Sequence, residues 1–211
     1  MIIEFINFFL NIEPNLSNLA SAYGVWIYFL LFLIIALETG VVIAPFLPGD
    51  SLIFVAGALA AQGSLEPFTL FLVFFSAAVF GDAMNYWIGY RVGKVLFRHE
   101  DSWLFRKAHL ERTSEFYERH GTKTIIIARF IPIMRTFAPF IAGMGKMNYV
   151  KFSTYNIVGG FLWVSLFLIG GFLFGNIPFV KDHLSIFIII IIVLSFIPLL
   201  AEIIIHRRKK L

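Results

Sequence analysis

Apolar residues form long continuous runs along this chain, separated by short polar stretches. Residues 68–87 and 152–175 are two such runs, and each approaches or exceeds the length of about 20 residues that a membrane-crossing helix needs. A third run covers residues 185–205. Transmembrane strands would instead alternate apolar and polar positions. The pattern therefore predicts an all-α integral membrane protein.

A further apolar segment, residues 25–61, is interrupted by proline, glycine and acidic residues. In chain order, the interruptions are Glu38, Pro45, Pro48, Gly49 and Asp50. Each uninterrupted piece is shorter than a span, and proline removes a backbone donor that lipid cannot replace. We predict a re-entrant helical hairpin, which enters the membrane and returns to the same side. One long kinked span followed by a short helix is the alternative.

The segment over residues 124–145 is broken in a similar way, but its charges are basic. It contains Arg129 and Arg135, and the expected hairpin breaks are Pro132, Pro139 and Gly143. An arginine at the centre of a membrane helix costs about 2.5–3.5 kcal/mol, so both side chains should face protein or a wet cavity. A continuous helix turns about 100° per residue and would splay two side chains six positions apart. The break at Pro132 therefore predicts that both arginines converge on one pocket.

Two segments resemble helices that lie along the membrane surface. Residues 1–22 are too short for a span plus its flanks, and their phenylalanines follow helical spacing. Residues 94–123 form the main polar segment and carry many of the basic residues. We predict an interfacial helix in the first and a cytoplasmic amphipathic helix in the second.

The order of these elements repeats along a single membrane domain, residues 1–211. An interfacial helix, a hairpin and a span occupy residues 1–93, and a similar series occupies 94–178 before the final helix at 183–205. Residues 51–58 resemble 137–144, and each of the first two spans ends in a GxxxG pair, a pattern typical of helix packing. The spans run in opposite directions, so the sequence predicts an inverted repeat, a feature of transporters.

Composition and charge agree with a membrane protein and set its orientation. Hydrophobic residues make up 59% of the chain, and all seventeen Lys and Arg residues lie after position 90. Basic residues mark cytoplasmic loops, so the C-terminus is expected in the cytoplasm. The basic residues flank membrane segments, which favours anionic lipids over nucleic acid as partners. The chain has no cysteine, and its five histidines show no metal-ligand spacing, so we expect neither a metal nor a cofactor.

The charges within the apolar segments are expected to pair. Four isolated charges would be costly in a bilayer, whereas Glu38 and Asp50 could largely offset Arg129 and Arg135 across two facing hairpins. Asp82, within the span at 68–87, is a weaker candidate, as a proton relay or as the partner of a nearby backbone group or of Asn85. The alternative is that the charged groups only clamp the hairpins together.

These positions resemble the DedA family of membrane proteins, also called the VTT or SNARE-associated domain family. The matching motifs are Glu38-Thr39-Gly40, Pro45-Phe46-Leu47-Pro48-Gly49-Asp50, Gly81-Asp82 with Tyr86 and Gly89, and the run from Ala128 to Gly143 that holds both arginines. The resemblance covers about residues 24–175. It implies facing re-entrant hairpins, the bacterial cytoplasmic (inner) membrane and transport of lipid phosphates such as undecaprenyl phosphate or a phospholipid.

We hypothesise that Arg129 and Arg135 bind the phosphate, because a guanidinium meets phosphate with two parallel hydrogen bonds and stays charged. Phosphate would displace Glu38 and Asp50, whose protonation would couple transport to protons. A proton-coupled ion or drug exporter that supports membrane homeostasis is the main alternative. An enzyme is not expected, because the apolar core lacks histidine and cysteine nucleophiles. A scaffold role and the oligomeric state, a homo-oligomer included, stay open.

Overall fold

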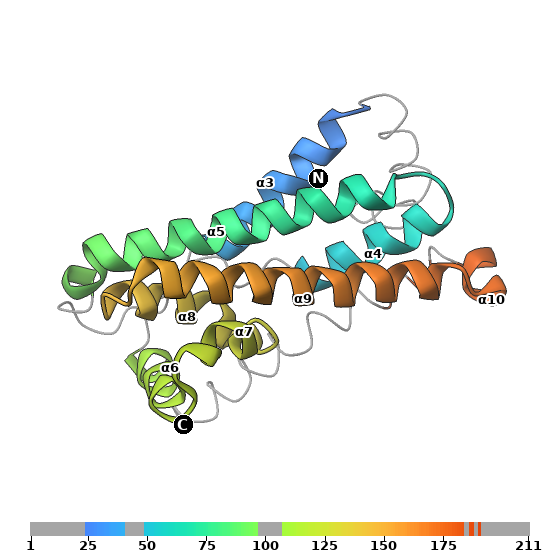
Figure 1. Cartoon of the computed structure of the whole chain (residues 1–211). Coiled ribbons are helices and arrows are strands. Elements are labelled where there is room, and N and C mark those ends of the chain that lie inside the picture. Colours follow the sequence, from blue (N-terminus) through green and yellow to red (C-terminus); the bar gives the residue numbers. More distant parts are fainter. Residues whose placement is uncertain (1–23, 41–48, 97–106, 184–185, 188–189, 191–211) are drawn as a thin grey trace, which may run out of the picture. The chain divides into compact units, whose positions relative to one another are not determined.

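The computed structural model describes residues 24–40, 49–96, 107–183, 186–187 and 190. All regular secondary structure in these residues is helical (Figure 1). The helices are α3 (Trp26–Gly40), α4 (Gly49–Ala61), α5 (Pro67–Leu96), α6 (Lys107–His120), α7 (Thr124–Ala128), α8 (Pro132–Met144), α9 (Tyr149–Gly175) and α10 (Pro178–Asp182), with a 3-10 turn at Gly121–Lys123 before α7.

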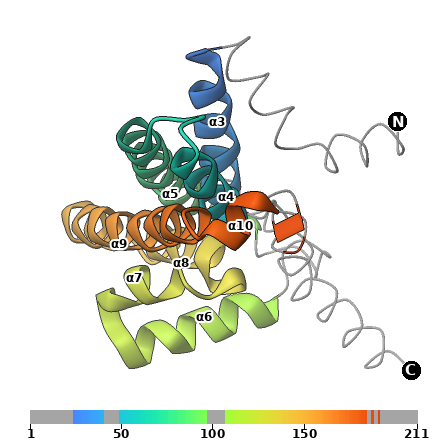
Figure 2. The same cartoon turned by 90° about the vertical axis from the view of Figure 1, so that its right-hand side faces the viewer.

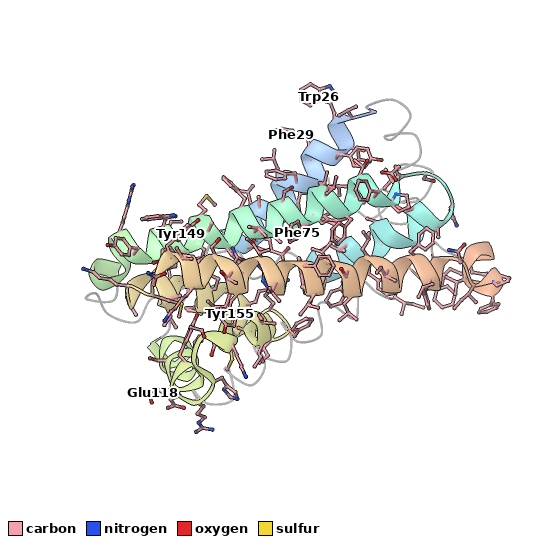
Figure 3. All side chains as sticks on the ribbon, in the orientation of Figure 1. Trp26, Phe29, Phe75, Glu118, Tyr149 and Tyr155 are labelled. Atoms are coloured by element: carbon pink, nitrogen blue, oxygen red, sulfur yellow. The ribbon has the colours of Figure 1, made fainter. Side chains whose placement is uncertain are left out.

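Within the described residues, two helices are long and apolar enough to cross a membrane, and they match two of the predicted spans. They are Pro67–Arg91 within α5 and Tyr149–Gly175, which is all of α9. Helices α3 and α4 are also apolar but shorter. The surface of α3 exposes large apolar side chains, among them Trp26 and Phe29 (Figure 3). Such a surface suits contact with lipid.

The remaining predictions concern segments outside the two long spans. The interfacial helix at 1–22, the breaks at Pro45 and Pro48, and nearly all of the final helix at 183–205 lie outside the described residues. The amphipathic segment at 94–123 contains α6, which is confirmed as a helix over Lys107–His120. Gly49 is the first residue of α4.

The segment over residues 124–145 breaks at Pro132 but not at the two later positions. Pro132 is the first residue of α8, where its missing N–H costs nothing. The helix then continues through Pro139 and Gly143 to Met144, so our expectation of breaks at these two residues was wrong. Because proline has no N–H, one hydrogen bond within α8 is missing at Pro139. The close packing of α8 against α5, described below, stabilises the helix despite this missing bond.

Contacts between Cα atoms divide the chain into two compact units. Of the described residues, one unit takes 24–30, 49–71 and those from 165 to 190, and the other takes 31–40, 72–96 and 107–164. The boundaries fall inside α3, α5 and α9, so these helices contribute to both units.

In the first unit, α4 and α9 approach so closely that their backbones touch at glycines. A Cβ atom on Gly57 would overlap the carbonyl oxygen of Leu168, and one on Gly171 would overlap that of Phe54. A Cβ on Gly175 would lie 2.7 Å from the Cα of Ala58. The GxxxG pair at the end of α9 is thus a helix-packing site.

In the second unit, α5 and α8 cross with the same reciprocal pattern. A Cβ on Gly143 would overlap the carbonyl oxygen of Tyr86, and one on Gly89 would overlap that of Phe140. The four helices share one spacing. In each helix, the packing glycine lies three residues after the residue whose carbonyl oxygen contacts the glycine of the other helix. The two crossings therefore use equivalent positions in α4 and α8, and in α9 and α5.

Helix α6 packs against α7 and α8 within the second unit (Figure 2). The hydroxyl of Tyr117 on α6 donates a hydrogen bond to the carbonyl oxygen of Ala138 on α8, at 2.9 Å. Burial raises the pKa of Tyr117, and the negative charge of Asp82 raises it further. The tyrosine therefore stays protonated and keeps its donor.

Two adjacent glycines of α9 offer a matched test of the α4–α9 crossing. In Gly171→Ala the new methyl group would collide with backbone, which cannot rotate away, so we expect a loss of about 1–3 kcal/mol of stability. In Gly170→Ala it would meet only the Phe54 ring, at 3.6 Å, so stability should be kept or raised. Thermal unfolding in detergent measures both, and equal stability of the two variants would contradict the crossing.

Candidate functional site

The side chain of Arg129 is buried among α5, α7 and α9. Arg129 is the residue directly after α7, and only 2% of its surface is exposed. Its Nη2 lies 2.5 Å from Oδ2 of Asp82 on α5 and also donates to Oδ1 of Asn156 on α9. The amide nitrogen of Asn156 in turn donates to the carbonyl oxygen of Val79, at 3.0 Å. One nitrogen of the guanidinium is therefore held by two helices.

The rest of this guanidinium has donors to spare. Nε and Nη1 of Arg129 are buried and have no hydrogen-bond partner among the described residues. Nε carries one N–H and Nη1 carries two. Oδ1 of Asp82 and Oδ1 of Asn85 are likewise buried without a partner there. Buried polar groups nearly always find a partner, so this cluster marks a place where another polar species can be bound.

Arg135 lies in the first turns of α8 and is also buried. Its Nη1 is 3.5 Å from Oε1 of Glu38 on α3. Its guanidinium carbon lies 4.1 Å from the centre of the Trp163 ring on α9, within the range of a cation–π contact. Since Trp163 is fully buried, the positive charge is held between a carboxylate and an aromatic face.

Asn85 joins three helices next to these charges. Its side-chain nitrogen donates to the carbonyl oxygen of Thr39 on α3, at 3.2 Å, and to that of Thr136 on α8, at 2.7 Å. The approach of α3 to α5 is also close, because a Cβ on Gly81 would overlap the hydroxyl oxygen of Thr39. The acids and arginines thus sit in a frame of short backbone and amide contacts.

The sequence and the structure agree only in part on which charges pair. Glu38 pairs with Arg135, and it is one of the two acids that we expected to pair with the arginines. The partner of Arg129 is Asp82, which we ranked as the weaker candidate. Asp50 lies in the first turn of α4 and is half-buried; it belongs to the other compact unit, so its predicted role stays a prediction.

Two contacting residues, Asn156 and Trp163, were missed from the sequence, and Asn85 was considered only as a possible partner of Asp82. The two asparagines carried a usable signal, because polar residues inside apolar spans are costly and often functional. Asn156 and Trp163 are seven residues apart, or two helical turns, which puts them on one face of α9. Both arginines therefore contact the same face of this helix, although Arg129 lies in a turn and Arg135 in a helix.

The family model of the VTT domain matches residues 47–173. This range covers 127 of the 211 residues and includes Asp82, Arg129, Arg135 and Asn156. The chain belongs to the DedA family. It is 52% identical to protein DedA of Escherichia coli (strain K12) over 205 residues, which cover 96% of this chain and 94% of that protein.

Other relatives of this DedA-family protein are also named as membrane proteins. It is 42% identical over 167 residues to an uncharacterized membrane protein of Mycobacterium leprae, covering 79% of this chain and 75% of the relative. It is 36% identical over 157 residues to the inner membrane protein YqjA of Escherichia coli (strain K12), covering 72% and 69%. No solved structure matches the chain. We conclude that this DedA-family chain is a membrane protein.

The Arg129–Asp82 pair should dominate the stability of its unit. Asp82→Asn keeps the shape of the side chain but leaves the buried guanidinium without its counter-charge, which typically costs about 3–5 kcal/mol. We expect a lower thermal midpoint in detergent, with partial recovery in the double variant Asp82→Asn, Arg129→Gln. Glu118→Gln on the exposed surface of α6 is the control (Figure 3). If Asp82→Asn unfolds at the wild-type temperature, the ion pair is not formed.

Proposed function

We propose that this protein translocates a lipid phosphate between the two leaflets of the membrane, with coupling to protons. The observation that carries the proposal is the state of Arg129. The guanidinium is buried and anchored through Nη2, while its Nε and Nη1 donors have no partner among the described residues. A phosphate presents several acceptor oxygens around one centre, which suits a guanidinium that is fixed at one nitrogen and open at the others.

A lipid is the form of phosphate that best fits the surroundings of the site. The helices that carry the charges expose large apolar side chains on their outer surfaces, including Leu33, Phe80 and Phe161. A lipid tail could stay in contact with such surfaces while its headgroup enters the polar cluster. Undecaprenyl phosphate and phospholipids share this chemistry, and a transport assay must distinguish them.

The proton coupling follows from the balance of charge at the site. Asp82 offsets Arg129, and Glu38 offsets Arg135. A phosphate that binds both arginines adds negative charge, so the displaced carboxylates would repel it unless they take up protons. We propose that Asp82 and Glu38 do so on binding and release the protons when phosphate leaves. Asp50 remains a further candidate from the sequence.

We also propose an inverted repeat with two re-entrant hairpins as the architecture of this transporter. The reciprocal glycine crossings support it, because α4 packs on α9 as α8 packs on α5, at equivalent residues of each pair. The hairpin of each repeat would then pack against the span of the other. The basic residues that follow position 90 support a cytoplasmic C-terminus in a bacterial inner membrane.

Purified protein in lipid vesicles tests the function directly. A labelled lipid phosphate in one leaflet should appear in the other, faster with a proton gradient than without one. A matched neutral lipid should not move. If the protein moves a cation or a drug against the proton gradient but no lipid phosphate, it is an exporter. Release of inorganic phosphate from the lipid would instead indicate an enzyme, and no movement of any substrate would indicate a scaffold.

The same assay applies to Arg135. We expect Arg135→Lys to lower transport by about tenfold or more, because lysine lacks the planar fork that binds two oxygens and stacks on an indole. The exposed Arg119→Lys on α6 is the matched control and should transport at the wild-type rate. Full activity of Arg135→Lys in a folded protein would exclude bidentate phosphate binding at this residue.

A further inference from the structure

One face of α9 contacts both arginines. It consists of Asn156, Gly159, Gly160 and Trp163, and we refer to these four residues as the α9 arginine face. Their spacing of three, four and seven residues puts them side by side on a helix. Their neighbours on the outer side of α9, such as Phe161 and Leu162, are exposed and apolar. The arginine face is therefore distinct from the lipid-facing surface.

The first half of this face supports Arg129. Asn156 accepts a hydrogen bond from Nη2 of the arginine and donates one to the carbonyl oxygen of Val79, so the amide is fixed at both ends. A Cβ atom on Gly159 would lie 3.1 Å from both Cδ and Nε of Arg129. The arginine side chain therefore lies close against the helix backbone, and a methyl group at position 159 would force it to shift by a few tenths of an ångström.

The second half of the face supports Arg135. The ring of Trp163 covers one side of the guanidinium at 4.1 Å. The N–H donors of a guanidinium lie at its edge, so an indole in contact with the central carbon supports the charge without accepting a conventional hydrogen bond. A carboxylate in this position would offset the charge and occupy donors, whereas an aromatic ring does neither.

We infer that the α9 arginine face is a positioning surface that sets both guanidinium groups at the angles needed to share one phosphate headgroup. This inference rests on the proposed function and adds two residues to its site, Asn156 and Trp163. Both are uncharged, so they hold the arginines in place and leave the positive charge available to the anion. The binding site is then built by the second hairpin and by α9 together.

Trp163 is tested by two substitutions that both remove volume but differ in aromatic character. Trp163→Leu loses the cation–π contact, and we expect the KM for a labelled lipid phosphate to rise about tenfold. Trp163→Phe keeps a ring under the guanidinium and should stay within about threefold of the wild type. The buried Phe74→Leu on α5 controls for a cavity that does not touch either arginine. Thermal unfolding of all three variants shows whether they are folded.

Asn156 is tested by adding charge. Asn156→Asp keeps an acceptor for Nη2 but removes the N–H that donates to the carbonyl oxygen of Val79, so a purely structural role predicts a less stable protein with an unchanged KM. A positioning role predicts that a second carboxylate on Arg129 also reduces its attraction for phosphate, so KM should rise about tenfold or more whether or not the thermal midpoint falls.

The outcomes separate this inference from the proposed function. If the wild type moves lipid phosphate, and Trp163→Leu and Asn156→Asp raise KM while Trp163→Phe does not, the inference is supported. If the wild type transports and Trp163→Leu matches it, the inference fails and the proposed function stands. If Trp163→Phe and Trp163→Leu are equally impaired, Trp163 only fills volume and the inference also fails. If the folded wild type neither binds nor moves lipid phosphate, both fail.

Discussion

The burial of two arginine charges within apolar helices is the constraint on which the rest of this structure depends. A guanidinium out of water is costly unless it is paired and hydrogen-bonded. Arg129 meets this requirement through Asp82 and Asn156, and Arg135 through Glu38 and the ring of Trp163. The partners come from α3, α5 and α9, so the two charges bring together helices that are distant in sequence.

Close helix packing makes this arrangement possible. The arginine and carboxylate side chains meet only because the backbones approach to contact distance, and glycines at the crossings remove the side chains that would keep them apart. Gly143 and Gly89 bring α8 onto α5, and Gly159 leaves room for Arg129 along α9. The stability of this arrangement therefore depends on these small residues, which let the helices form a close frame around the charged groups.

The sequence predicted much of this structure because membrane segments carry strong local signals. Length and hydropathy identified both long spans, and the cost of charge in lipid identified Arg129, Arg135 and Glu38 as residues that must find partners. The same reasoning ranked Asp82 too low, since a lone acid in a span can be satisfied in several ways. It also treated Pro139 and Gly143 as breaks, because a local rule for helix termination does not include the neighbour that packs against the helix.

What the sequence by itself determined is the class of protein, the two spans, the turn at Pro132 and the identity of the charged residues. These follow from the solvation of single residues and from backbone geometry, which act over a few positions. The tertiary structure alone decided that Arg129 pairs with Asp82, that α8 runs unbroken through Pro139, and that Asn156 and Trp163 carry both arginines. Such choices depend on contacts between residues that are 27 to 97 positions apart in the chain. The pairing energy exists only once the helices that bear the partners have packed.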